Sequence, residues 1–83
     1  MAVLFDYSEY EASHGKAPRG RGGWAFKFRT EDGYVVADEA DVERLGRDLA
    51  EVHFAPSGTF AEAKRWARAK AKELGAFQVR VCS

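Results

Sequence analysis

The sequence predicts a small α+β domain in which a mostly antiparallel sheet of three to five strands packs on one or two helices. The chain has 83 residues, which is room for a single domain over residues 1–83. Several short segments alternate apolar and polar residues, as half-buried strands do, and two longer segments repeat apolar residues at helical spacing. Their positions give the order strand, strand, strand, helix, short strand, helix, strand, which favours a sheet with helices on one face.

Two early segments alternate in the manner of strands. The first covers residues 3–7 and the second covers residues 24–29. In the second segment Trp24, Phe26 and Phe28 share one face, because successive side chains of a strand point to opposite sides of the sheet. We expect this aromatic face to lie in the core, with a base-stacking platform as the alternative.

A turn and a third strand follow. Asp32 and Gly33 stand between two apolar runs, and glycine accepts the positive φ that tight hairpin turns require. The third strand is therefore expected near residues 34–37, antiparallel to the second strand.

An acidic helix is expected over residues 38–52. Its apolar residues fall at helical spacing between Val42 and Val52, and Asp38 has the position and side chain of an N-cap. Gly46 lies inside this segment and costs about 1 kcal/mol relative to alanine in a helix. Acids in the first turn complement the helix dipole, so most of them are expected on a solvated face.

The second predicted helix, from Thr59 to Gly75, has the clearest signals in the chain. Thr59 and Glu62 have the spacing of a capping box, and Gly75 has the position of a C-cap. Alanine and other good helix formers fill the interval. The apolar stripe of this helix consists of Phe60, Ala63, Ala67, Ala71 and Leu74.

Short strands are expected on either side of that helix. Residues 51–56 precede it, with Val52 and Phe54 on one face, and Pro56 ends the strand. Residues 76–81 follow it as the last strand. The inward side chains of that strand are expected to be Phe77, Val79 and Val81, and the outward ones Gln78 and Arg80.

The charges of the chain come in blocks although they sum to zero. Residues 1–13 hold three acids and no base, whereas residues 14–30 hold five bases and no acid. Residues 31–51 hold eight acids against two bases, and residues 52–83 hold six bases against two acids. Separated blocks predict either one basic and one acidic surface, or blocks that neutralise each other in the fold.

The basic block predicts a non-enzymatic module that binds the backbone of DNA or RNA. Its stretch "HGKAPRGRGG" has two glycines at P-loop spacing, but Arg21 and Gly22 stand where a P-loop needs Lys and then Ser or Thr. We expect a flexible hairpin loop that continues into an open sheet face, where Arg80 also lies. The alternative is a solvated loop that keeps a sheet edge soluble. The predicted contacts are Lys16, Arg19, Arg21, Lys27 and Arg29.

Two stretches of the chain show a local family resemblance. "GGWAFKF" followed by "SGTFAEAKRWA" resembles plant-type DNA-binding domains and phage-integrase arm-binding domains, which place a Gly-x-Trp strand before a Gly-Thr-Phe helix. The resemblance covers about half of the chain and implies a three-stranded sheet that reads a DNA groove. The acidic helix and the last strand depart from the pattern, so no site residue is carried over.

The acidic block predicts a second function, a small phage- or mobile-element-encoded inhibitor that binds a host protein complex, in the manner of an anti-CRISPR protein. Its acids would imitate a phosphate backbone and occupy the partner's nucleic-acid channel. Docking through the basic surface and a homodimer that pairs basic with acidic helices are further options. The predicted contacts of the acidic helix are Asp41, Glu43, Asp48 and Glu51.

Other function classes find little support in the sequence. His14 and His53 lie in no metal-ligand spacing, and no nucleophile and base converge, so neither an enzyme nor a metal or cofactor site is expected. Cys82 is the single cysteine and has no disulfide partner, which favours a reducing, cytoplasmic setting. No apolar run approaches the roughly 18 residues of a membrane span, and the first residues lack a signal peptide's basic start, so no membrane partner is expected.

Overall fold

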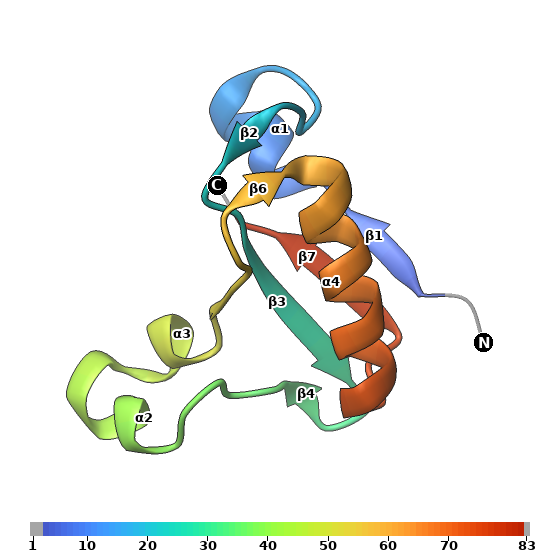
Figure 1. The fold of residues 1–83 in the computed structure, drawn as a ribbon. Helices are drawn as coiled ribbons and strands as arrows, with labels where there is room; N and C mark the ends of the chain where they lie inside the picture. Colours follow the sequence, from blue (N-terminus) through green and yellow to red (C-terminus); the bar gives the residue numbers. More distant parts are fainter. Residues whose placement is uncertain (1–2, 83) are drawn as a thin grey trace.

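The computed structural model describes residues 3–82 and confirms the α+β class. A five-stranded, mostly antiparallel sheet is covered on one face by the long helix α4, and a two-stranded sheet lies beside it (Figure 1). In chain order the elements are β1 (Leu4–Asp6), α1 (Ser8–His14), β2 (Arg21–Gly22), β3 (Ala25–Thr30), β4 (Gly33–Tyr34), α2 (Ala40–Leu45), α3 (Arg47–Ala50), β5 (His53–Phe54), β6 (Gly58–Thr59), α4 (Phe60–Leu74) and β7 (Gln78–Val81).

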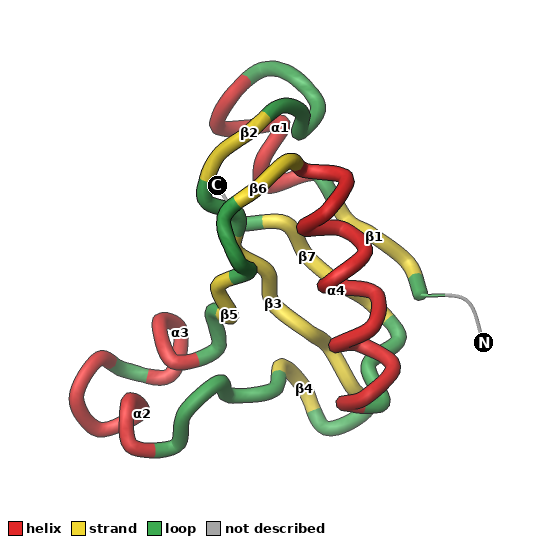
Figure 2. The backbone as a smooth tube through the Cα atoms, viewed as in Figure 1, coloured by secondary structure: helices red, strands yellow, loops and turns green. Residues whose placement is uncertain are grey.

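The strand β7 has neighbours on both of its edges in the main sheet. It pairs in parallel with β1 and antiparallel with β3, so the strand order is β1-β7-β3-β4. β5 pairs with the start of β3 and β4 with its end, whereas β2 and β6 form the separate two-stranded sheet (Figure 2). The predicted hairpin loop over residues 14–23 is therefore wrong, because β7 lies between the two strands that the loop was expected to join.

The core lies between β3, β7 and α4, as the alternation in β3 predicts. Trp24, Phe26 and Phe28 are buried on the α4 side of the sheet. The side chains of α4 that pack against them are alanines. Such small side chains let the helix backbone approach the sheet and leave room for the aromatic rings. The remaining buried apolar side chains of this core are Ala63, Ala67, Ala71, Ala76, Val79 and Val81.

Both ends of α4 form as the sequence predicts. The Thr59 hydroxyl accepts a hydrogen bond from the backbone N–H of Glu62 at 3.2 Å, and the Glu62 carboxylate accepts one from the Thr59 N–H at 3.0 Å. These hydrogen bonds from Thr59 lower the pKa of Glu62, because they favour its charged form. Gly75 ends the helix with φ 73°, a left-handed conformation that glycine adopts without a steric penalty.

The acidic segment differs from the prediction of a single helix. Gly46, with φ 87° and ψ 157°, divides it into α2 and α3, because that backbone conformation lies outside the helical region and interrupts the helix. The third strand is also shorter than predicted and covers only β4. Beyond it the Ala37 N–H donates to the Ala50 carbonyl at 2.8 Å, so the chain turns toward α3 and leaves β3.

Two aromatic side chains at the edges of the sheet lie outside the core, and for Phe77 this contradicts the prediction. In β5, His53 is buried and Phe54 is 78 % exposed, because Phe54 stands opposite Ala25, on the face of β3 away from the core. The His53 ring is held inward by a hydrogen bond between its Nε2 and the Val35 carbonyl, 3.0 Å apart. Phe77 was expected in the core, but it lies before the start of β7 and is partly exposed.

Candidate nucleic-acid interface

The sheet face away from α4 carries cations from two neighbouring strands. Lys27 of β3 stands opposite Arg80 of β7, and Arg29 stands opposite Tyr34 of β4. Residues that stand directly opposite one another share a face, and these alternate with the buried Phe28. We call the surface formed by Lys27, Arg29, Arg80 and Tyr34 the basic face.

Aromatic rings lie beside the cations of the basic face. The Tyr34 ring centroid lies 5.7 Å from Lys27 Nζ and 6.0 Å from Arg80 Cζ, and the Phe77 ring centroid lies 5.9 Å from Arg29 Cζ. These distances are at the limit of cation–π attraction. The contacts are therefore weak, and they leave the charges of Lys27 and Arg29 available to an anion.

One acid lies beside this surface. Asp6 of β1 contacts Arg80 with an N–O distance of 3.4 Å. Hydrogen bonds from the side chain and backbone of Ser8 lower the pKa of Asp6, and the charge of Arg80 lowers it further. Within residues 3–82 Lys27 and Arg29 form no ion pair of this kind, so they are the cations of the basic face with the most charge to offer.

The Gly-rich segment is anchored rather than free. It begins directly after α1, where Gly15 caps the helix with φ 69°. At its other end Arg21 pairs with Thr59 in the β2–β6 sheet, and the Phe60 N–H donates to the Gly20 carbonyl at 2.8 Å. The side chains of Lys16, Arg19 and Arg21 are exposed, so the anchoring fixes the backbone and leaves the charges at the surface.

A groove of about 430 Å³ lies where the Gly-rich segment meets the start of β3. It opens on the same side of the sheet as the basic face, because Ala25 and Phe54 point away from the core. Burial raises the pKa of the Cys82 thiol in this groove, and the charge of Glu9 adds to the effect. We call this the aromatic groove; its lining residues are Tyr10, His14, Arg19, Arg21, Gly22, Gly23, Trp24, Ala25, Phe54 and Cys82.

The predicted basic residues thus fall into two neighbouring groups. Lys27 and Arg29 lie on the basic face, and Arg19 and Arg21 line the aromatic groove. Lys16 is exposed in the connection between α1 and β2 and does not line the groove. The sequence did not predict the ring-bearing residues of the basic face and the aromatic groove, because no pattern among their sequence neighbours marks them. These residues are Tyr10, His14, Tyr34 and Phe54.

The predicted acidic contacts do not form one uniform surface. Glu51 is 7 % exposed and receives a hydrogen bond at 3.2 Å from Nε of Arg47. Asp41 forms an ion pair with Arg44 on the next turn of α2. The exposed and unpaired acids of residues 38–51, which we call the acidic lobe, therefore include only two of the four predicted contacts, Glu43 and Asp48.

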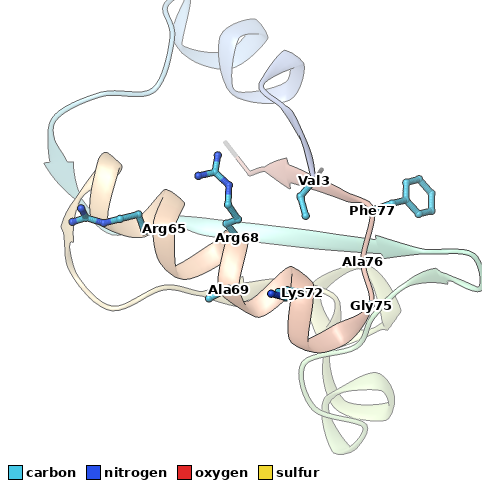
Figure 3. A pocket seen from close by; sticks show the side chains of 8 residues that line it. All are labelled: Val3, Arg65, Arg68, Ala69, Lys72, Gly75, Ala76 and Phe77. Atoms are coloured by element: carbon cyan, nitrogen blue, oxygen red, sulfur yellow. The ribbon is translucent and has the colours of Figure 1, made fainter. Parts of the chain in front are cut away.

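Another groove, of about 820 Å³, lies beside α4 near the start of β7. Arg65, Arg68 and Lys72 line it, but the guanidinium groups of Arg65 and Arg68 point in different directions (Figure 3). The Arg68 guanidinium lies 5.4 Å from the Phe5 ring centroid, and Lys64 Nζ lies 5.0 Å from the same centroid. These cations cover an aromatic residue of β1 and do not converge on a single point.

Comparisons of the chain with protein-family models, curated proteins and solved structures give no match. Within residues 3–82 each helix is too short or too polar to cross a membrane. In the same part of the chain no three histidine, cysteine or acidic side chains gather where they would hold a metal ion. What the protein binds is therefore inferred from the charge and shape of its surface.

Proposed function

We propose that the protein binds the phosphate backbone of DNA or RNA along the basic face and the aromatic groove. The observation that supports this function is a set of four cations, two on the basic face and two in the adjoining aromatic groove, none of them in an ion pair within residues 3–82. Lys27 and Arg29 lie along β3, and Arg19 and Arg21 continue the same side beyond its start. A phosphate chain meets such a row of cations with little change in the protein.

The absence of net charge does not oppose this function. The chain carries 13 acidic and 13 basic residues, but four of the eight acids of residues 31–51 belong to the acidic lobe, whose helices α2 and α3 lie apart from α4 (Figure 1), while Glu31 and Asp32 lie in the turn after β3. Binding depends on the local potential, because charges further away than about 10 Å are screened at ordinary salt concentrations. Four phosphate contacts would give a salt slope of about −3.6 on duplex DNA and about −2.8 on a single strand.

Removing two charges of the basic face tests the proposal. In the double variant Lys27→Gln with Arg29→Gln, we expect the slope of log affinity against log salt to become less steep by about 1.4 to 1.8, because each lost phosphate contact releases one fewer counterion. Fluorescence anisotropy with labelled oligonucleotides between about 50 and 200 mM salt measures this slope.

The matched control removes two cations that lie elsewhere. Arg44 and Lys70 are ion-paired with Asp41 and Glu73, so Arg44→Gln with Lys70→Gln changes the net charge equally without altering the basic face. We expect this control to bind like the wild type. An equal loss in both double variants would mean that only net charge matters, and no loss in the first would exclude the basic face as the interface.

We propose protein binding by the acidic lobe as a second candidate function. Leu45 and Leu49 are exposed there, and Leu49 is 60 % exposed beside the unpaired acids Glu43 and Asp48. Apolar side chains among acids suit a partner with a basic and partly apolar surface, such as a nucleic-acid-binding host complex.

The acidic lobe is tested by charge reversal. Glu43→Lys with Asp48→Lys is expected to abolish capture of the host complex in a pull-down, because like charges would then face each other. The control is Glu31→Lys with Asp32→Lys, which reverses two exposed acids in the turn between β3 and β4. Capture that survives in the first variant would exclude the acidic lobe.

A further inference from the structure

The aromatic groove contains one ring, that of Phe54, which stacks on no other ring within residues 3–82. Within residues 3–82 Phe54 is the most exposed of the large apolar side chains, at 78 %, although it stands at the wall of a concave site. Tyr10 and His14, one turn apart on α1, also line the groove; their rings stack on each other with centroids 4.1 Å apart and planes 21° apart, and the Tyr10 ring centroid lies 5.6 Å from that of Trp24. The exposed ring of Phe54 is therefore free to stack on a flat ligand that enters the groove.

The charged side chains that line the aromatic groove are cations, although Glu9 lies close enough to act on the Cys82 thiol. The lining of the groove contains Arg19 and Arg21 and no acidic residue. Lys27 follows two residues after Ala25 on the same side of β3, so the cations continue from the groove onto the basic face. A ligand that suits the groove therefore combines a flat apolar ring with an anionic group that extends beyond it.

We propose that the ligand of this surface is a single-stranded nucleic acid, with one unpaired base held in the aromatic groove. The base stacks on the exposed ring of Phe54, and the adjoining phosphates lie against Arg19 and Arg21. The strand then runs over Lys27 toward Arg29 along β3. The inference rests on the proposed function and specifies its ligand.

Shape and chemistry favour a single strand over a duplex. The bases of a duplex are stacked and paired inside it, so they cannot present a face to Phe54, whereas the bases of a single strand can. A volume of about 430 Å³ lies within the usual range of small-ligand sites, which run from about 300 to 1,000 Å³. A phosphate backbone alone would use the arginines and leave the aromatic rings unused.

The variant Phe54→Ala separates stacking from charge. We expect it to bind a labelled 15-nucleotide oligothymidine about 5- to 100-fold more weakly than the wild type, because one base-stacking contact is lost. Its salt slope should stay unchanged, because no phosphate contact is removed. The conservative variant Phe54→Trp should restore binding, since tryptophan offers an equivalent ring.

Three controls make the result specific. Leu49→Ala removes another highly exposed apolar side chain, on the acidic lobe, and should bind like the wild type. An abasic strand of the same length should bind wild type and Phe54→Ala equally, because it has phosphates and no bases. Bound oligothymidine should also slow alkylation of Cys82 in the wild type, since that thiol lines the groove.

The outcomes distinguish the ligand from the function. One outcome is salt-dependent binding with equal affinity to single strands and duplexes, and no effect of Phe54→Ala. That result would overturn the inference but leave the proposed backbone binding intact. An equal loss for Phe54→Ala on the abasic strand would likewise overturn it. Absence of binding to any nucleic acid at about 50 mM salt would remove the proposed function and with it this inference.

Discussion

Phe28→Ala is expected to destabilise the domain by about 3 to 5 kcal/mol, which is a large share of its total stability. The Phe28 ring is 0 % exposed and lies at the middle of the core, with ring-centroid distances of 4.8 Å to His53 and 6.2 Å to Trp66. Truncation leaves a cavity that strand and helix cannot close, because both backbones are held by their own hydrogen bonds. A domain of this size has a total stability of only about 4 to 12 kcal/mol.

Urea or thermal unfolding followed by circular dichroism measures this effect. The matched control is Phe54→Ala, the same substitution at an exposed position, for which a change of at most about 0.5 kcal/mol is expected. A Phe28→Ala protein as stable as the wild type would mean that Phe28 does not lie in the core between β3 and α4.

Ala67→Leu is expected to destabilise the domain by about 1 to 3 kcal/mol through the opposite change, overpacking. Ala67 is fully buried between α4 and the sheet, together with Ala63 and Ala71. Three added carbon atoms at this position would push the helix away from the aromatic side chains of β3. Unfolding in urea measures the loss.

Ala69→Leu is the control for that substitution. Ala69 lies on the exposed side of the same helix, so the change in helix propensity is the same and the packing against the sheet is not altered. Equal stabilities for the two leucine variants would contradict the close approach of α4 to the sheet.

Local patterns predicted the elements whose determinants are close in sequence. The capping box and the C-cap glycine defined α4, and the alternation of residues 24–29 identified both faces of β3. The cations Lys27 and Arg29 could be placed outside the core on the same ground. Each of these features depends on residues within about four positions of one another, which is the range over which helix and strand periodicity operate.

Pairing between distant segments could not be read from the sequence. The parallel pairing of β1 with β7 joins residues 74 positions apart, such as Asp6 and Arg80. The sequence of neither strand indicates which strand it pairs with. The outward position of Phe54 has the same origin. β5 has two residues, so its register against β3 decides which side chain faces the core. The aromatic groove therefore could not be predicted from the sequence, although its two arginines were predicted as nucleic-acid contacts.

The place of β7 between β1 and β3 also sets an order of events during synthesis. β7 is the last element of the described chain to be translated, and neither neighbour can complete its ladder before it emerges. Until then the aromatic side of β3 is covered by α4 at most, and β1 has no strand to pair with. The nascent chain thus exposes the apolar side of β3 until the end of the described chain has been made. Its folding rate is governed by long-range loop closure, which is slower than forming local helices.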